Sequence, residues 1–418
     1  MDKNTRLPRV GPKAAPSTAP ASLWSNRNFL YLWTGTILSN FGYQIYLVAL
    51  PLLIYDMTRS ALTMSMMRAI DFFPNIMIGM VAGVIVDRFS RKRVMSISVL
   101  LRLFTLAGIM FLLYANRLEL WHLYVLGFVL SAAGYTFGNS HHSVLPLLLD
   151  KKQLTAANAQ LTFVDTLIMM VGPGVAGVLI AAFSYEVSFG IFLACIVLLW
   201  ICVSLTRIPE TASRATGAKF SVWKEMKEGI DALLDNKVLL TPTLAVLFNN
   251  FSASLTSGVL MFFAVDVLHA TDQQVGLMIG MGAAGGMVGS VCIPWLRKRY
   301  GRGRLYVGCV LTEVLGFLLL VFAYAWWVIG FGLFIRTFAI TMSNVVYFTI
   351  RQEFTPNHLL GRVAGTSSML MKLALPLGLF ISGIWAEYLP IPLLFLMSAV
   401  LTFMMFLILR KHSFVNVQ

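Results

Sequence analysis

The fold is decided by the way one apolar stretch ends, at Gly83-Val84-Ile85-Val86-Asp87-Arg88-Phe89-Ser90-Arg91-Lys92-Arg93. The preceding residues, 61–82, are mostly apolar, and the sequence then changes within a few positions to one acid and a run of bases. About 20 helical residues cross a hydrocarbon core of about 30 Å, and bases gather where a chain leaves the membrane on its cytoplasmic side. The stretch therefore predicts a membrane-spanning helix followed by a basic loop.

Apolar runs of this kind recur along the whole chain. Of the 418 residues, 58% are apolar and only 12% are charged, and the mean hydropathy is +0.78. These values exclude a soluble domain of ordinary composition and a disordered chain. The predicted fold is an all-α membrane protein with twelve transmembrane helices in two groups of six. The predicted spans are 28–55, 61–86, 94–115, 119–144, 155–183, 187–206, 240–267, 273–296, 304–323, 325–350, 361–387 and 391–410.

The meaning of the net charge of +14 depends on where the charges lie. The N-terminal tail, the loops on its side of the membrane and the C-terminus hold almost all of the excess lysine and arginine, whereas the opposite loops are slightly acidic. This asymmetry predicts that both termini are cytoplasmic and that the protein lies in the cell membrane, in contact with the lipid bilayer. The bases thus report topology, and we expect no nucleic-acid partner.

The two groups of six spans resemble two copies of one unit. Asn40-Phe41 aligns with Asn250-Phe251, and at the same offset Asp56 aligns with Asp266. Such a repeat favours two halves that rock about a site between them. The predicted divisions are a disordered tail, an N-terminal half, a linker, a C-terminal half and a second tail, at 1–27, 28–206, 207–239, 240–411 and 412–418. The linker is expected to hold an amphipathic helix, either on the membrane surface or packed on the bundle.

The stretch at 83–93 resembles the signature loop of the major facilitator superfamily, in which a glycine, three residues and Asp-Arg precede a basic run. The resemblance implies that family's twelve-helix fold in two pseudo-symmetric halves. It also implies a conformational latch made by Gly83, Asp87, Arg88 and Arg91. Ser90 stands where the family usually has a glycine. A purely topogenic loop is the alternative, although it leaves the position of Asp87 unexplained.

A second motif, Gly172-Pro173-Gly174-Val175-Ala176-Gly177, resembles the Gly-Pro antiporter motif of exporters in this superfamily. Pro173 removes a helix hydrogen bond and the glycines thin the helix, so that it can bend and seal against the other half. The sites implied by the motif are Gly172, Pro173 and Gly177, and simple helix packing is the alternative. Together with the run at 145–159, the motif is most similar to the branch that contains enterobactin exporters and macrolide efflux proteins.

The resemblance implies a secondary transporter that exports amphipathic small molecules, such as a drug, macrolide, siderophore or related natural product, by alternating access. Proton antiport is expected to drive export, with a small-molecule substrate and protons as partners and no cofactor beyond the proton gradient. The alternatives are an uptake symporter or a lysolipid flippase on the same fold, and a non-transporting receptor or assembly protein. No set of nucleophile, base and orienting residue stands out, so we expect no enzyme activity, and we expect a monomer.

Seven charged residues lie more than two positions inside the ends of the predicted spans, where each unpaired charge costs about 2.5 kcal/mol or more. They are Arg68, Asp71, Arg102, Asp165, Glu313, Arg336 and Lys372. Counted from the ends of the spans 61–86 and 361–387, Asp71 and Lys372 lie near the midplane of the membrane. The resemblance implies that these two spans face each other across the two halves. We therefore hypothesise an Asp71–Lys372 contact that forms and breaks as the halves rock. A static pair of Arg68 with Asp71 is the alternative.

The other charges in the spans receive separate interpretations. Arg336 lies in the span 325–350, and the resemblance implies that this span lines the central cavity. Its guanidinium suits an anionic group or a partner acid. Asp165 is a further titratable candidate, because a desolvated carboxylate can exchange a proton. Arg102 and Glu313 are related by the repeat and are interpreted as structural charges near the inner helix ends. The candidates for proton or ion coupling are Asp71, Asp165, Lys372 and Arg336.

Polar residues at matched depths predict an amphipathic pocket between the halves. Its candidate lining is Asn40, Tyr43, Gln44, Asn139, Asn249, Asn250, Arg336 and Asn344. His141 and His142 are neighbours on one helix and point about 100° apart, so they cannot share an ion. We predict no metal site and interpret both histidines as a polar helix end near water.

Overall fold

The computed structural model describes residues 1–418 except 1–22, 210–226, 228–229, 235, 356–359 and 412–418. In this part of the chain every element is a helix. The N-terminal half comprises η1 (Leu23–Ser25), α1 (Arg27–Thr58), α2 (Ala61–Arg88), α3 (Arg91–Tyr114), α4 (Leu120–Leu148), α5 (Lys151–Ala182) and α6 (Tyr185–Leu205). The C-terminal half comprises α8 (Lys237–Phe262), the π-helical turn η2 (Phe263–Val267), α9 (Asp272–Tyr300), α10 (Arg302–Val321), α11 (Trp326–Phe354), α12 (Leu360–Tyr388) and α13 (Ile391–Lys411).

Short polar signals in the sequence set the ends of these helices. The side chain of Asn26 accepts from the backbone N–H groups of Asn28 and Phe29 at the start of α1. Thr271 and Gln274 cap the start of α9 reciprocally. Gly301, with a φ of 71°, separates α9 from α10 in a conformation that a side chain would strain. Capping satisfies the N–H groups that a helix leaves unpaired in its first turn.

The predicted spans agree with the helices of the structure. Among the described residues, eleven helices are long and apolar enough to cross a membrane. The remaining long helix, α2, has 28 residues and contains Arg68, Asp71, Asp87 and Arg88. Its length alone suffices for a crossing, because 28 residues extend about 42 Å at 1.5 Å per residue. Every predicted span thus corresponds to a helix long enough to cross the membrane.

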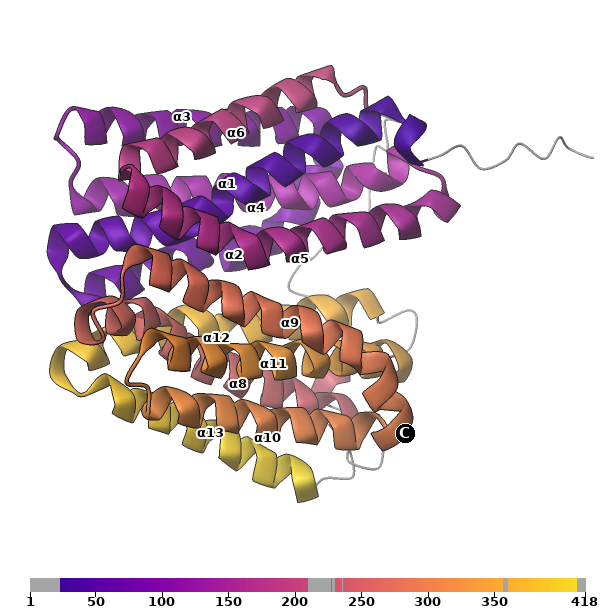
Figure 1. The fold of residues 1–418 in the computed structure, drawn as a ribbon. Helices are drawn as coiled ribbons and strands as arrows, with labels where there is room; N and C mark the ends of the chain where they lie inside the picture. The colour runs from indigo at the N-terminus through magenta and orange to yellow at the C-terminus, as the bar shows by residue number, and fades with distance from the viewer. Residues whose placement is uncertain (1–22, 210–226, 228–229, 235, 356–359, 412–418) are drawn as a thin grey trace, which may run out of the picture.

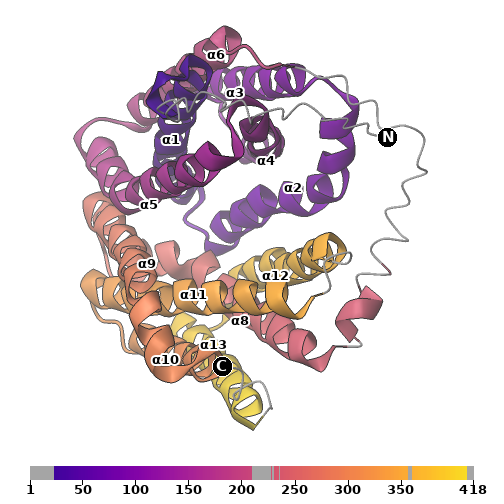
Figure 2. The ribbon, with the colours of Figure 1, turned by 90° about the vertical axis from the view of Figure 1, so that its right-hand side faces the viewer.

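The two halves repeat the same packing scheme, which confirms the predicted repeat. In the N-terminal half, α1 packs on α5 and α6, α4 packs on α2 and α3, and α3 packs on α6. The C-terminal half repeats these pairs, with α8 on α12 and α13, α11 on α9 and α10, and α10 on α13. Figure 2 shows the two six-helix groups facing each other, with α5 next to α9 and α2 next to α12.

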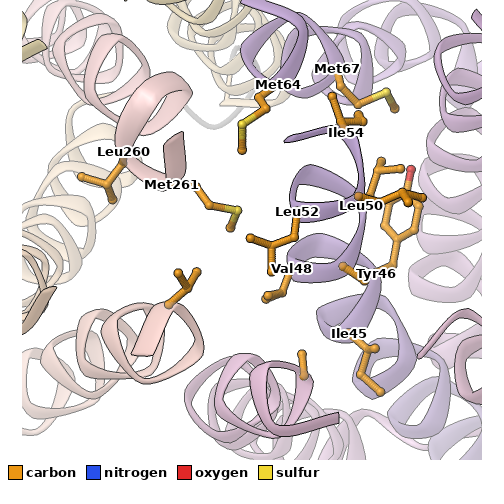
Figure 3. Packing of buried hydrophobic residues seen from close by; sticks show 14 of the residues in the cluster. Ile45, Tyr46, Val48, Leu50, Leu52, Ile54, Met64, Met67, Leu260 and Met261 are labelled. Atoms are coloured by element: carbon orange, nitrogen blue, oxygen red, sulfur yellow. The ribbon is translucent and has the colours of Figure 1, made fainter. Parts of the chain in front are cut away.

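One end of the bundle carries the acids Asp56, Asp266, Asp272 and Glu387, and we call it the acidic end. The opposite end carries the bases at 91–93 and 297–304, and we call it the basic end. At the acidic end, buried residues of both halves form a single hydrophobic core. Figure 3 shows part of it, with Leu52 of α1 and Met261 of α8 directed toward each other from the two halves.

At the basic end the cores of the two halves are separate. One cluster, which includes Phe29, Leu145 and Leu161, belongs to the N-terminal half alone. Another, which includes Ile293, Val310 and Val346, belongs to the C-terminal half alone. Figure 1 shows α5 and α9 close together near the α5–α6 turn and diverging toward their other ends. The halves are thus joined at the acidic end and apart at the basic end.

Parts of the predicted division of the chain lie outside the described residues. These are most of the tail 1–27, most of the linker helix and the C-terminal tail 412–418. Within the described end of the linker, Leu233 is buried against Leu239 of α8 and Val363 of α12. This contact attaches the last part of the linker to the C-terminal half.

Candidate functional site

Asn40 and Asp165 form a polar contact between the first and fifth helices. The side-chain amide of Asn40 donates to Asp165 Oδ1 at 2.7 Å, and both side chains are half-buried. Two turns further along α5, Gly172 allows α1 to pass so closely that a Cβ there would lie 2.7 Å from Gln44 Cβ. Asn40 and Gln44 are one turn apart, so they share the face of α1 that meets α5.

Asp71 and Lys372 meet α4 from opposite halves and do not pair with each other in this conformation. The carboxylate of Asp71, 7% exposed, accepts from Ser131 Oγ at 2.8 Å. Lys372 Nζ lies 5.7 Å from the ring centroid of Tyr135, one turn further along α4. The alternative partner of Asp71, Arg68, donates to the Leu47 carbonyl oxygen at 3.1 Å. The hypothesised Asp71–Lys372 contact therefore remains a prediction for another conformation.

Arg336 is buried between α11 and α10 and has an acid near it, in keeping with the partner acid that the sequence left open. Its side chain is 5% exposed, and its guanidinium lies 4.0 Å from the ring centroid of Phe317 on α10. Glu313, on the same helix α10, is 0% exposed, and Arg336 lies within electrostatic range of it. The depth of Arg336 can be read from the sequence, whereas packing fixes the rotation of its helix and therefore which acid it faces.

The remaining residues of the predicted pocket occupy varied positions. Tyr43 stacks on Tyr46, with ring centroids 5.8 Å apart. Two amides donate to backbone carbonyls, Asn139 to Tyr135 at 2.9 Å and Asn250 to Met371 at 3.0 Å. Asn249 and Asn344 are half-buried on α8 and α11. Asn250 thus joins α8 to α12 within one half, whereas Asn40 joins α1 to α5.

The Gly-Pro motif of α5 lies where the two halves touch. A Cβ on Gly177 would collide with the backbone oxygen of Asp272, at the start of α9. A Cβ on Gly276 of α9 would likewise collide with the backbone oxygen of Pro173. Close backbone contact of this kind requires small residues on both helices. The motif therefore forms part of the seal between α5 and α9 near the acidic end.

Three of the four predicted latch residues, Gly83, Asp87 and Arg88, belong to the part of α2 whose side-chain surroundings the structure does not describe. The fourth, Arg91, is half-buried at the first turn of α3. Ser90 caps α3, since its hydroxyl accepts from the backbone N–H of Arg93 at 3.3 Å. The serine that replaces the usual glycine therefore contributes a helix cap.

Hydrogen bonds between the halves at the acidic end were not foreseen from the sequence. Tyr55 Oη donates to Asp266 Oδ1 at 2.9 Å, and Ser60 Oγ donates to Glu387 Oε1 at 2.6 Å. Asp56, the repeat equivalent of Asp266, instead accepts from Tyr185 of its own half at 2.5 Å. The repeat offset singles out the two aspartates in the sequence. Only the fold shows that Asp266 accepts a hydrogen bond from the other half whereas Asp56 does not.

We expect Glu387→Ala to loosen the acidic end. The reporter is Leu52→Cys in a chain whose four native cysteines are serines, labelled with a membrane-impermeant maleimide. An exposed hydrogen bond to a carboxylate contributes less than about 1 kcal/mol, so labelling should accelerate about two- to fivefold. Glu186→Ala, which removes another exposed acid at the same end, should leave the rate unchanged. Equal rates for the two variants would show that Glu387 does not hold the halves together.

His141 is buried, contrary to the interpretation of both histidines as a helix end near water. It is 4% exposed and stacks on Phe137 with ring centroids 6.0 Å apart, whereas His142 is exposed. The two rings point to different sides of α4, which places one in the core of the half and one outside it.

Two six-helix halves of the same packing scheme, joined at one end and apart at the other, define a membrane transporter built from an internal repeat. The sequence model of the Major Facilitator Superfamily matches residues 32–379. The chain belongs to this family, and its members are transporters rather than enzymes.

The chain is similar to curated members of the family over most of its length. It is 24% identical to macrolide efflux protein A of Streptococcus pyogenes, over 89% of this chain and 93% of that protein. It is 26% identical to the multidrug efflux pump Tap of Mycobacterium bovis, over 86% of this chain and 87% of that protein. These matches identify the protein as a relative of efflux pumps.

Solved structures share the fold. The D323A mutant of the nucleoside transporter NupG aligns with a TM-score of 0.77 and 13% identity, over 92% of this chain and 99% of that one. A bacterial homologue of the iron transporter ferroportin, in its inward-facing state, aligns with a TM-score of 0.70 and 18% identity, over 94% and 100%. At these identities the likeness concerns the fold alone.

Proposed function

We propose that the protein exports amphipathic small molecules, with macrolides among them, by alternating access driven by proton exchange. The observation that carries this proposal is the similarity to macrolide efflux protein A over 93% of that protein's length. The small-residue seal between Gly177 and Gly276 supports it, because alternating access needs two halves that part and close again.

The proposed orientation places the basic end and both termini in the cytoplasm, with the protein in the cell membrane. The supporting pattern is the concentration of lysine and arginine at that end. In this orientation the halves are apart on the cytoplasmic side, where an exporter takes up its cargo. Each chain contains both halves of the site, so we propose a monomer as the working unit.

Two carboxylates of the N-terminal half, those of Asp165 and Asp71, are proposed to take part in transport. Asp165, held by Asn40, would attract a cationic amine of the substrate, since a half-buried carboxylate interacts strongly with a cation. Asp71, held by Ser131, would change partner toward Lys372 as the halves rock. The proton gradient supplies the energy, and protons and the small molecule are the proposed partners.

The test uses everted membrane vesicles and erythromycin, a macrolide with one basic amine. We expect accumulation in the vesicles when they are energised and its loss when nigericin dissipates the pH gradient. Asp165→Asn should reduce accumulation at least about tenfold, the equivalent of about 1.4 kcal/mol, within the range of a lost charge-assisted contact. Asp150→Asn is the control on the same helix, because asparagine caps a helix as well as aspartate.

Two results would overturn the proposal in different ways. Accumulation in right-side-out rather than everted vesicles would show uptake instead of export. Erythromycin movement that is unaffected by nigericin would leave export intact and remove proton exchange as its driving force.

A further inference from the structure

The interior of the C-terminal half contains three polar groups whose atoms lack partners. Both carboxylate oxygens of Glu313, Nε of Arg336 and Oδ1 of Asn249 are buried and have no hydrogen-bond partner among the described residues. Glu313 is 0% exposed and Arg336 is 5% exposed. Buried polar atoms are nearly always paired, so three such groups in one place point to a functional role.

Close packing of α10 on α11 brings these groups together. A Cβ on Gly332 would lie 2.8 Å from Leu320 Cδ2 and 3.1 Å from the backbone oxygen of Gly316. This contact draws α11 toward α10, and Arg336, one turn after Gly332, then lies against Gly316 and Phe317. Glu313 is one turn before Phe317 on α10. The small residues therefore enclose the acid and the base in one apolar interface.

The ionisable groups around Glu313 are few. Arg336 faces it from α11, and Tyr306 and Cys309 lie near it on α10 itself. Asn249 contributes an uncharged amide from α8. The charged residues of the other helices that pack on α10 lie at helix ends, at Asp272 and 297–299 in α9 and at 410–411 in α13.

A carboxylate in such a place can be ionised or neutral, and each state has a cost. Ionised, it is attracted to Arg336 and lies beside the amide of Asn249, but its charge is removed from water. Neutral, it avoids the cost of burying a charge. Arg336 stays protonated in either state, because a guanidinium does not lose its proton in proteins. Asp71 and Asp165 differ, since each has a fixed donor, in Ser131 and Asn40.

Asn249 links this interior site to the surface between the halves. It lies on α8, which packs on α2 of the other half as well as on α12. The next residue, Asn250, already joins α8 to α12 through the Met371 carbonyl. A change of charge at Glu313 therefore acts directly on a helix that has to move when the halves rock.

We propose that Glu313, with Arg336 as its fixed counter-charge, is the group that carries the exchanged proton. In this step the O–H bond of the neutral Glu313 carboxyl breaks, its electron pair stays on the carboxylate, and the proton leaves to water on the cytoplasmic side. Return of a proton from the opposite side restores the neutral carboxyl. The assignment rests on the proposed proton exchange and gives the proton to an acid inside the C-terminal half rather than to Asp71 or Asp165.

The first experiment uses the unaltered full chain, purified in detergent, and dicyclohexylcarbodiimide, which modifies neutral carboxyl groups in apolar surroundings. Mass spectrometry of the digested protein should show modification of Glu313. Erythromycin should slow the modification several-fold, because substrate and proton compete in an exchanger. Modification of Asp71 or Asp165 with Glu313 unmodified would overturn the assignment, as would a Glu313 rate that erythromycin does not change.

The second experiment measures protons released into weak buffer when erythromycin is added. The wild-type chain and Cys309→Ala, which alters the packing one turn from Glu313 without removing a carboxyl, should release protons equally. Glu313→Gln should bind erythromycin and release at most about a tenth as much, equivalent to about 1.4 kcal/mol of lost coupling. Full release by Glu313→Gln would refute the assignment alone. Binding without release by the wild-type chain would refute proton exchange itself.

Discussion

Gly276→Val is expected to abolish most export while the protein still folds. A side chain at this position would meet the Pro173 backbone, with the Pro173 carbonyl carbon 3.1 Å and Gly174 Cα 3.2 Å from its Cβ. Backbone atoms cannot swing aside as a side chain can, so α5 and α9 must separate. Overpacking costs about 1–3 kcal/mol, which shifts the balance between the two access states roughly five- to 150-fold.

The measurement is erythromycin accumulation in everted vesicles, compared at equal amounts of protein. Gly308→Val is the matched control, because nothing lies within 4 Å of a Cβ at Gly308, an exposed position on α10. The control should transport within about twofold of wild type, as surface substitutions change stability by about 0.5 kcal/mol or less. Comparable losses of accumulation in both variants would show that valine impairs transport wherever it replaces a helix glycine. The contact between α5 and α9 would then have no particular role in export.

Arg336→Leu is expected to be strongly destabilising. It leaves Glu313, which is 0% exposed, without the cation that faces it from α11. An ionised carboxylate that stays buried without a counter-charge costs about 3–5 kcal/mol, so the loss of stability should be largest at alkaline pH, where the carboxyl is ionised. The midpoint of thermal unfolding in detergent should fall markedly, and the double variant Arg336→Leu/Glu313→Gln should recover most of the loss.

Arg102→Leu is the matched control for this prediction. Arg102 is also 5% exposed and lies over an aromatic ring, 5.7 Å from the Phe192 centroid, but no acid faces it within its half as Glu313 faces Arg336. Replacing an unpaired buried cation with an apolar residue removes a desolvation cost, so stability should be unchanged or higher. A loss of thermal stability as large as that of Arg336→Leu would mean that the packing of the arginine side chain, and not its charge, stabilises the protein.

The fold could be predicted almost entirely from the sequence, because the length of an apolar run and the charge at its ends suffice to find a span. The repeat was visible for the same reason, in pairs such as Asn40 and Asn250. The contacts of the site were less accessible. Nothing in the sequence marks Ser131 as a partner of Asp71, yet it is the donor to that carboxylate, sixty positions away in the sequence.

Rotation of the helices explains most of the remaining differences. The depth of Arg336 followed from counting residues, but its approach to Glu313 depends on Gly316 and Gly332, which set how α10 and α11 meet. The interpretation of Glu313 as a structural charge near a helix end was wrong in position, since it is the twelfth residue of the 20-residue α10 and wholly enclosed. The middle position could have been read from the predicted span 304–323, whereas the enclosure could not, because it depends on the neighbouring helix.

The two glycine faces of α9 limit how this transporter can evolve. Gly276 and Gly280 meet α5 of the other half, whereas Gly282, Gly285 and Gly289 meet α11 of their own half. Few substitutions can be accepted on either face, because each added side chain would strike backbone or close-packed atoms. Variants selected for a new range of compounds should therefore accumulate on α1, α4 and α8, while α9 stays nearly invariant as the part that both halves share.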